Sequence, residues 1–567
     1  MTLATRHHAR MIRLVGVIAL IAIGAGVAQW TSAARSAPLT RLVTLPLGAE
    51  ATGLFLSGPD SLFLNVQHPA ATNQAPYNRA TVGVVEGLGP ATLGDDPDPL
   101  GLPATPRQRQ EVRTAVGRYR ILAQAGDRFG GAVPAGLGGI AGAGGEVVRR
   151  SNDPDFNAFV AVDRDPDRGF LFTNWEDRPG GMSRIGLERG PGGHWRVRQG
   201  QARMLDFRGV RGTWVNCFGT LSPWRTPLSS EELYFPQTGH WNAPDHRRHG
   251  ALQDLARYLG HADFGEAWPN PYDYGYIVEV TDPTGRAVPR KRRALGRFSH
   301  ENAVVMPDDE TVYLSDDGTG TVLFKFVADR AGDLTAGTLY AATARQDPGE
   351  AEPAVAGFDL RWVRLGHAAG SEVAAWAGEY DGIGLADYRA GASSYISDAE
   401  ICHWAEARRG RDLACDGDAT ADADPFGDDR PAFLESRKAA AALGATAEFR
   451  KMEGVTVHLG GARDGSVPYV YLAMSQVNET MADNRGDIRL RANPCGVVYR
   501  MPLTADYDVR RLEPVAAGGV PGEAGCPDAG LANPDNLVVL PDGRVVVGED
   551  SPFHDNNMLW LLDPAGA

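Results

Sequence analysis

The stretch NCFGTLSPWRTPLSSEE, residues 216–232, joins two short apolar runs across a turn that contains Pro223. Its first run opens on Cys217, and its second run ends on the adjacent carboxylates Glu231 and Glu232. Period-two alternation that is broken by Pro, Asp or Gly is typical of a β-hairpin. A thiolate is a soft ligand and a carboxylate a hard one, so a site that uses both favours a transition metal beside a second, oxygen-liganded cation.

Five further segments follow the same plan of an apolar run, a turn and a second run. Four of them open on an acidic residue, namely Glu50, Glu301, Glu453 and Asp535, and a looser copy runs from Phe156 to Asp177 and ends on Glu176. Two of them also end on paired acids, Asp316–Asp317 and Glu549–Asp550. Six hairpins at long, uneven intervals predict an all-β fold, a six-bladed β-propeller with insertions between the blades.

The acidic residues share one phase of the repeat. An acid or Asn before a strand often only ends a loop, so a single segment is ambiguous. If corresponding residues of each blade lie at the same end of the central channel, however, the carboxylates converge there. A dense ring of carboxylates cannot stay ionised without cations, so the repetition favours metal binding.

Composition narrows the classes of function. The 567 residues include 69 Gly and 38 Pro, a high share that suits a turn-rich β-protein. The net charge is −15 and no basic stripe is present, so we do not expect nucleic acid as a partner.

The N-terminus predicts export. Arg6, Arg10 and Arg13 precede an apolar run from Leu14 to Ala28 and then small residues, so residues 1–37 are interpreted as a secretory signal peptide, or alternatively as an uncleaved anchor. Both interpretations place the protein outside the cytoplasm, periplasmic or secreted, and only the anchor involves a membrane. No adjacent arginine pair marks a twin-arginine signal.

Five cysteines fit an oxidising compartment. Cys402 with Cys415 and Cys495 with Cys526 are plausible local disulfides, although sequence does not fix the pairing. Cys217 is left over, and metal ligation is one explanation for a free thiol in an exported protein.

Residues 38–567 are expected to form a single propeller domain with insertions at about 70–150, 233–296 and 330–449. Helices are predicted at 106–125, 251–258 and 431–449. The acidic stretch 415–431 has the alternating Asp spacing of a calcium loop, with a solvated acidic loop as the alternative.

Five quoted segments carry a resemblance to a known family: NCFGTLSPWRTPLSSEE, GRFSHENAVV, YLSDDGTGTVLFKFV, KMEGVTVH and NPDNLVVLPDGRVVVGED. Over about residues 155–560 they resemble the PhoX-type alkaline phosphatases, secreted phosphatases with a six-bladed propeller. The resemblance implies hydrolysis of small phosphomonoesters at a site with two irons and several calciums.

The resemblance also implies roles for individual residues. Cys217 would be the iron thiolate, with Glu232, Glu301 and Glu453 as bridging carboxylates and Asp316 or Asp317 as a calcium ligand. Lys451 stands where the family has a basic residue, an arginine, on the phosphate. We add further metal ligands from the hairpin pattern: Glu50, Glu176 and Asp535.

Some features depart from the family pattern. The segment that opens on Glu50 resembles the C-terminal part of family members, so we expect a closing blade that is permuted to the N-terminus. NWED, residues 174–177, only partly follows the family's Asn-His-Glu, and Glu176 stands at the position of the glutamate. We expect a monomer.

Two rival functions each fit part of the sequence. A propeller lactonase or esterase with one calcium would suit Asn302 and Asn536 beside carboxylates, and a non-catalytic propeller would use calcium only for stability. Cys217 discriminates against both, because a hard calcium site gives a thiolate no role.

Overall fold

The computed structural model describes residues 37–235, 237–261, 263–265, 267–414, 422–459, 469–519 and 525–566. Residues 1–36, which contain nearly all of the predicted signal segment, lie outside this range. Cys415 and the first half of the acidic stretch also lie outside it, and with them the expected pairing of Cys402 with Cys415.

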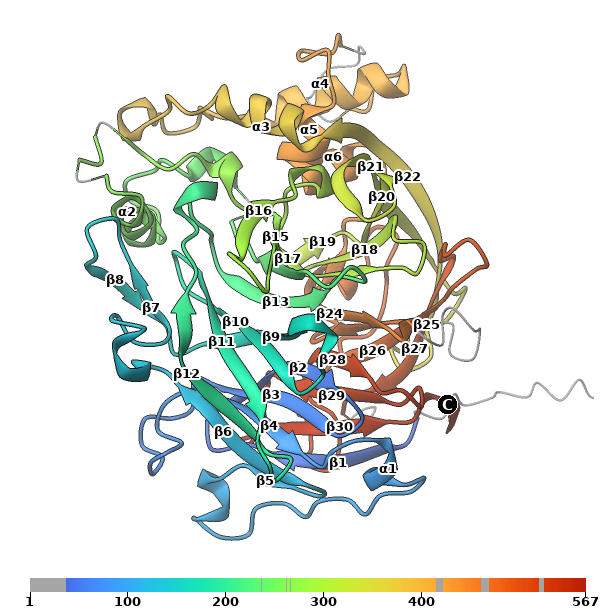
Figure 1. Cartoon of the computed structure of the whole chain (residues 1–567). Coiled ribbons are helices and arrows are strands. Elements are labelled where there is room, and N and C mark those ends of the chain that lie inside the picture. The colour runs from blue at the N-terminus through green and yellow to red at the C-terminus, as the bar shows by residue number, and fades with distance from the viewer. Residues whose placement is uncertain are drawn as a thin grey trace, which may run out of the picture.

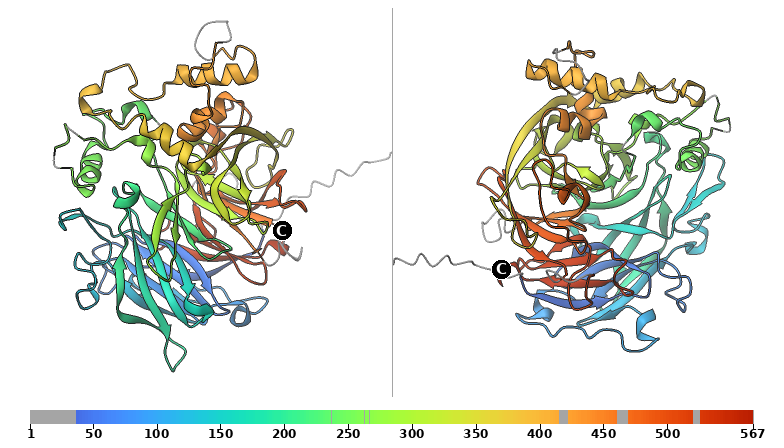
Figure 2. Two further views of the ribbon diagram at one scale, coloured as in Figure 1. Left: turned by 45° about the horizontal axis from the view of Figure 1, so that its top comes forward. Right: turned by 180° about the vertical axis from the view of Figure 1, so that it is seen from behind.

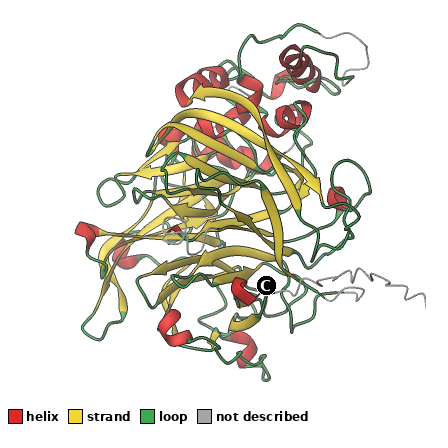
Figure 3. Cartoon of the chain, turned by 90° about the vertical axis from the view of Figure 1, so that its right-hand side faces the viewer, coloured by secondary structure: helices red, strands yellow, loops and turns green. Residues whose placement is uncertain are grey.

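Strands dominate the described residues (Figure 3), and their antiparallel pairing arranges most of them in six blades. The first blade consists of β2 (Glu50–Ser57), β3 (Ser61–Gln67), β4 (Thr81–Glu86) and β6 (Arg118–Gln124). The second consists of β9 (Pro154–Ala161), β10 (Arg168–Trp175), β11 (Gly181–Arg189) and β12 (Trp195–Met204). The third consists of β13 (Asn216–Leu221), β14 (Pro227–Glu231), β15 (Ile277–Thr281) and β16 (Val288–Lys291).

The other three blades follow in chain order. The fourth consists of β17 (His300–Val305), β18 (Thr311–Asp316), β20 (Phe324–Arg330), β21 (Asp333–Gln346) and β22 (Phe358–Ala369). The fifth consists of β24 (Met452–Val457), β25 (Tyr469–Met474), β26 (Val497–Pro502) and β27 (Arg511–Ala517), and its outer edge pairs with β22. The sixth consists of β28 (Pro534–Val539), β29 (Val545–Glu549), β30 (Met558–Leu562) and β1 (Leu39–Thr44), with the short β5 (Arg113–Thr114) beyond β1.

The first strands of the six blades form a closed ring. Each contacts the first strands of both neighbouring blades, in the order β2, β9, β13, β17, β24, β28 and back to β2. This arrangement confirms the all-β, six-bladed propeller. It also means that the starts of six strands, which are far apart in sequence, meet at one end of the channel.

The ring closes through N-terminal sequence, but through a different segment from the one we expected. β1 pairs antiparallel with β30, from Leu39 opposite Leu562 to Thr44 opposite Met558, so blue and red strands lie side by side in Figure 1. The hairpin that opens on Glu50 does not belong to this blade, because it pairs with β4 and β6 as the inner half of the first blade. The N-terminal strand β1 thus closes the ring by pairing with the last blade. The prediction that the Glu50 hairpin belongs to the last blade is wrong.

The helices lie outside the ring. They are α1 (Pro90–Leu93), α2 (His249–Tyr258), α3 (Gly370–Gly378), α4 (Asp398–Arg409), α5 (Arg430–Leu434) and α6 (Ser436–Ala442). α3 to α6 gather over one edge of the propeller (Figures 1 and 2). In the part of the chain that the structure describes, no helix has the length and apolar character needed to cross a membrane.

Two of the three predicted helices are present at least in part. α2 confirms the helix at 251–258, and α5 and α6 cover much of 431–449. The helix at 106–125 is wrong: this segment contains one short 3-10 turn, then β5 and β6. β6 pairs with β4 along its length, so sheet pairing overrides the helical spacing of Val112, Val116 and Ile121.

Apolar side chains fill the space between neighbouring blades. Between the first and second blades, Phe63 stacks on Phe159 with ring centroids 6.0 Å apart, and Trp195 meets Phe159 at 4.9 Å. Close packing of this kind fixes the blades relative to one another. The strand starts are therefore held on a rigid frame.

Candidate metal centre

One side chain from the start of each inner strand points into a common buried region. Glu50 is the first residue of its strand, and each of the other five is the second residue of its strand. The six residues, all buried, are Glu50, Asp155, Cys217, Glu301, Glu453 and Asp535. The residues that share one phase in the sequence repeat therefore occupy corresponding positions around the channel.

A second set of side chains comes from the position just after the second strand of each blade. Antiparallel pairing places the end of the second strand opposite the start of the first, as with Asn216 opposite Glu231 and His300 opposite Asp316. The residues that follow these strand ends are His68, Glu176, Glu232, Asp317, Ser475 and Asp550. Five of these six are ionisable or metal-binding side chains.

The two sets combine into three connected groups of possible metal ligands. Within each group, one ligand atom from every residue lies within 4.8 Å of the others. The groups are Glu176–Cys217–Glu232, Asp155–Cys217–Glu301 and Glu301–Glu453–Asp535. Cys217 belongs to two groups and Glu301 to two, so the ligands form one continuous, largely buried centre.

Burial and mutual repulsion disfavour the ionised form of the side chains in this centre. Burial first, and then the neighbouring carboxylates, raise the pKa of Asp155 and of Glu453 to about 7. The same causes raise the pKa well above the ordinary value at Glu50, Glu176, Glu232, Glu301 and Asp535. Burial, followed by Glu176 and Glu301, also raises the pKa of the Cys217 thiol. Cations would reverse these shifts, because bound metal favours the deprotonated ligands.

Two buried oxygens support this fit. Oδ1 of Asp155 and Oε1 of Glu301 have no hydrogen-bond partner within the described part of the chain. A buried acceptor without a partner is costly, and metal coordination is a common way to satisfy one. The donor set of one thiolate and several carboxylates therefore suits a softer metal next to hard cations.

Lys451 lies at the edge of the centre. Its Nζ is 2.9 Å from Oδ2 of Asp317, 2.9 Å from Oε1 of Glu453 and 3.1 Å from the hydroxyl of Tyr234. Burial opposes the charge of this lysine, yet the two carboxylates raise its pKa well above the usual value. Burial also opposes the charge of Asp317, but Lys451 and hydrogen bonds, including one from Tyr234, lower its pKa. One cation with 20% side-chain exposure thus stands where the buried carboxylates meet the channel.

The family model described as alkaline phosphatase PhoX matches residues 177–564, more than half of the chain. The chain belongs to the PhoX alkaline phosphatase family. It is accordingly a phosphatase that hydrolyses phosphomonoesters. No curated protein sequence matches it.

Among solved structures, this PhoX family member resembles Pseudomonas fluorescens PhoX, which was solved in complex with vanadate, a transition state analogue. The two are 19% identical, the match covers 94% of this chain and 87% of that chain, and the TM-score is 0.50. At this identity the likeness shows the fold alone. A candidate 6-phosphogluconolactonase from Bacteroides uniformis also matches, at 8% identity over 70% of this chain and 78% of that one, with a TM-score of 0.25.

Most residues proposed from sequence meet in the PhoX centre. Cys217, the free and buried cysteine among the described residues, lies at its middle with the bridging candidates Glu232, Glu301 and Glu453. Asp535 and Glu176 join them. Of the pair Asp316 and Asp317, only Asp317 faces this region, where it contacts Lys451.

Asp316 lies outside the centre for a simple geometric reason. Successive residues of a strand point to opposite faces, so of two adjacent acids only one faces the channel. Oδ2 of Asp316 accepts a hydrogen bond from Nε of Arg437 at 2.9 Å, and Oε1 of Glu231 accepts one from Nζ of Lys291 at 3.0 Å. Glu549 likewise pairs with Nδ1 of His554 at 2.9 Å. These acids are structural, and their neighbours Asp317, Glu232 and Asp550 face the channel.

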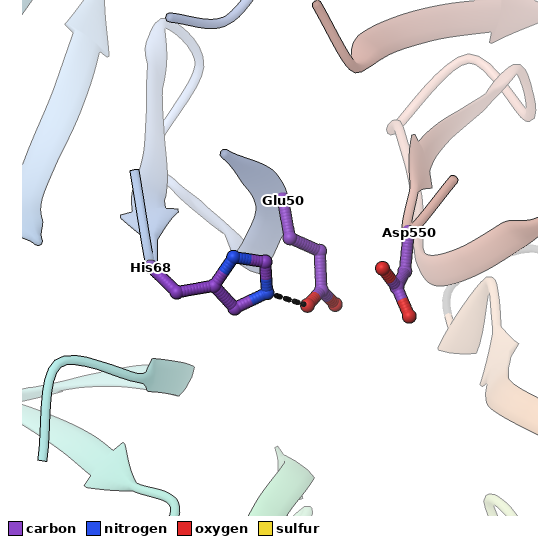
Figure 4. A group of neighbouring side chains, drawn as sticks. All are labelled: Glu50, His68 and Asp550. Atoms are coloured by element: carbon purple, nitrogen blue, oxygen red, sulfur yellow. Dashed lines mark hydrogen bonds and ion pairs between the residues drawn. The ribbon is translucent and has the colours of Figure 1, made fainter. Parts of the chain in front are cut away.

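Glu50 belongs to a separate, more open group. Its carboxylate lies between His68 and Asp550, with His68 Nε2 3.2 Å from Oε2 of Glu50 (Figure 4). His68 and Asp550 are exposed. This group offers a nitrogen ligand that the three buried groups lack.

Sequence reasoning missed Asp155 and Tyr234. The looser hairpin copy, quoted from Phe156, begins one residue after Asp155, and extending it by one position gives an acid in the same phase as Glu301 and Asp535. Tyr234 follows the Glu231–Glu232 pair and lies in no repeat, so it carried no signal.

The two asparagines that favoured a lactonase have another role. Nδ2 of Asn302 donates to the carbonyl of Val455 at 2.8 Å, and Oδ1 of Asn536 accepts from the amide of Gly53 at 2.8 Å. Each bond joins the inner strands of adjacent blades. These hydrogen bonds between blades account for both asparagines, and neither needs to be a calcium ligand.

Proposed function

We propose that this PhoX family member is an extracytoplasmic phosphatase that hydrolyses phosphomonoesters at a mixed iron and calcium centre in the propeller channel. The observation that carries this proposal is the position of Cys217. Cys217 belongs to two of the three sets of candidate ligands, and its thiol therefore lies at the middle of the centre. A purely calcium-binding propeller would have no use for a buried thiol in that place.

The residues divide by ligand type. Cys217, with Glu176 and Glu232 on one side and Asp155 and Glu301 on the other, would hold the iron. Glu453 and Asp535, which share a group with Glu301, supply only oxygen and suit calcium. When bound, such cations offset the negative charge of the phosphoryl group and activate the attacking oxygen.

The chain's own residues would bind and orient the substrate. Lys451 is held by Asp317 and Glu453, and cations on these carboxylates would free its ammonium group to donate to a phosphoryl oxygen. Tyr234 donates to Asp317 at 2.5 Å and lies against Lys451, so it fixes the position of both. Lys451 is thus the candidate catalytic residue, and Tyr234 a positioning residue.

A disulfide supports the extracytoplasmic part of the proposal. Cys495 and Cys526 form a disulfide, as expected from sequence, and such bonds persist in oxidising compartments. We propose residues 1–37 as a signal peptide or anchor that precedes a propeller domain over 38–567. We also propose that the protein acts as a monomer, because one chain supplies the whole ligand set.

The test is elemental analysis of protein purified without chelators, run beside hydrolysis of p-nitrophenyl phosphate. Iron and calcium should both be present, and Cys217→Ser should lose most of the iron and reduce kcat/KM by at least about a hundredfold, because loss of a group that only orients a metal ligand already costs about 10- to 100-fold. Calcium without iron in an active wild-type protein would refute the mixed centre while leaving the phosphatase class intact. Full activity in Cys217→Ser would remove the thiolate from the proposal.

A further inference from the structure

Five arginines line a cavity of about 450 Å³ next to the start of α2. They are Arg149, Arg178, Arg247, Arg248 and Arg257. Arg149 and Arg257 are neutralised by acids: Arg149 pairs with Asp177 at 3.0 Å, and Arg257 pairs with Asp254 at 2.5 Å. The other three have no acidic partner among the residues that the structure describes.

Two of the three unpaired arginines, Arg178 and Arg248, are half-buried, whereas Arg247 is exposed. Nε of Arg178 and Nε of Arg248 are buried and lack a hydrogen-bond partner within the described residues. Burial, followed by the charges of Arg178 and Arg247, lowers the pKa of Arg248 to about 10. Such a cluster is costly in an isolated protein, and it is unexpected in a chain of net charge −15. A bound anion would offset this cost.

The cluster lies beside the proposed catalytic centre. Arg178 follows Glu176, a ligand candidate, by two residues. Arg247 also lines a second cavity, of about 210 Å³, whose wall includes Tyr234 and Asp317, the two residues that contact Lys451. Arg247 therefore lies in the walls of both cavities, one of which also includes two residues that contact Lys451.

The other cations of the second cavity are already paired. Arg437 binds Asp316, and Lys438 Nζ lies 2.7 Å from Asp398. Arg297 is buried and donates to the carbonyl of Leu434 at 3.0 Å. Among the cations of this wall, Arg247 is thus the one without an acidic or carbonyl partner within the described range.

We infer that Arg178, Arg247 and Arg248 form a subsite for a second anionic group on the leaving-group side of the substrate. This inference rests on the proposed function, since it assumes that the phosphoryl group binds beside Lys451. The substrates favoured would be phosphomonoesters whose alcohol carries a carboxylate or a further phosphate. Guanidinium groups match both anions through paired, charge-assisted hydrogen bonds.

Matched pairs of substrates test this subsite. 3-Phosphoglycerate differs from glycerol 3-phosphate in its carboxylate, and fructose 1,6-bisphosphate differs from fructose 6-phosphate in its second phosphate. We expect the metal-loaded wild type to show a higher kcat/KM for the more anionic member of at least one pair. In Arg248→Gln and in Arg247→Gln that preference should fall about tenfold, as for loss of a charged hydrogen bond. The pair that responds identifies the anion.

Arg118→Gln is the matched control, because Arg118 is an exposed arginine on β6 without an ion pair among the described residues. It should leave the preference unchanged. An unchanged preference in both test variants would overturn the inference, and so would an equal loss for p-nitrophenyl phosphate, which has no second anionic group. A normal melting temperature for at least one test variant excludes misfolding.

Failure of the proposed function has a different signature. If the wild type hydrolyses none of these esters, the phosphoryl site is refuted, and calorimetric binding of 3-phosphoglycerate then tests the arginines alone. Weaker binding by Arg248→Gln than by Arg118→Gln would still support an anion site. Equal binding would overturn it.

Discussion

Adjacent acids at the strand ends have opposite roles, and the period of the strand decides which role each takes. Glu231 is fully buried and accepts hydrogen bonds from Lys291 and from the amides of Tyr276 and Trp214. Glu232, one residue later, belongs to the metal group of Cys217. The two side chains share backbone environment and chemistry but not function, so they form a natural matched pair for mutation.

Glu231→Gln should destabilise the fold, and Glu232→Gln should impair the centre. Glu231→Gln leaves the Lys291 ammonium, whose side chain has 0% exposure, without its charged partner, and we expect a loss of about 3–5 kcal/mol in the free energy of unfolding. Glu232→Gln should instead lower the iron content and kcat/KM with little loss of stability in chelated protein. Urea unfolding and elemental analysis of both variants test this division. Equal stability of the two variants would contradict it.

Lys451 provides a second prediction at the level of single residues. Lys451→Met should lower kcat/KM for p-nitrophenyl phosphate by about 10- to 100-fold, because a charged hydrogen bond to the phosphoryl group is lost. Lys451→Arg should retain most activity, since a guanidinium group can bind the same oxygens and the family resemblance places an arginine there. Steady-state kinetics at several phosphate concentrations, with product inhibition as a second readout, measure both effects. Equal activity of the methionine and arginine variants would exclude a role for the charge.

At the level of strands, polar side chains join the inner strands of neighbouring blades just behind the metal centre. Nδ2 of Asn157 on β9 donates to the carbonyl of Gly53 on β2 at 3.0 Å, and Asn536 on β28 accepts from the amide of the same glycine. Gly53 is therefore held from both sides, three residues after Glu50. A Cβ there would lie 2.3 Å from Nδ2 of Asn65 and 2.4 Å from the carbonyl of Asp155.

Gly53→Ala and Gly58→Ala separate close packing from backbone strain. Both glycines lie in the first hairpin with positive φ, +65° and +64°, but Gly58 has no atom within 4 Å of an added Cβ. Gly58→Ala should cost about 1–2 kcal/mol, the strain of a left-handed residue alone. Gly53→Ala should cost clearly more and should also reduce bound metal, because Asp155 must move. Thermal unfolding and metal analysis would refute this if the two variants behaved alike.

Local patterns predicted the elements well where periodicity and turn residues agreed. Six hairpins and the acids that open them were visible because each hairpin is a local unit. The strand that closes the ring, β1, was not visible, since its partner β30 lies more than 500 residues away and nothing local specifies that pairing. Arg178, Arg247 and Arg248 were missed for the same reason: their lack of acidic partners is a property of the folded structure.

At the scale of the whole molecule, the propeller concentrates negative charge that the sequence spreads over some 500 residues. Closing the ring brings Glu50 near Asp550 and Asp535, and Asp155 near Asp535, so after burial these neighbouring charges raise the pKa of Glu50 and of Asp155. Folding and cation binding are therefore coupled. A fold that places these acids together needs either protons or metal ions.

This coupling predicts how the stability of chelated protein depends on pH. Asp155 and Glu453 have folded pKa values of about 7, well above the values of an unfolded chain, so the folded state binds more protons between roughly pH 4 and pH 7. A raised carboxyl pKa makes stability fall as pH rises, because the deprotonated folded state is penalised. The melting temperature of chelated protein should therefore drop by about 5 °C or more between pH 5 and pH 8. Protein loaded with iron and calcium should show no such drop, and Asp155→Asn with Glu453→Gln should make the drop of chelated protein smaller. A flat curve in chelated wild type would mean that these carboxylates keep ordinary pKa values and that the centre does not require cations.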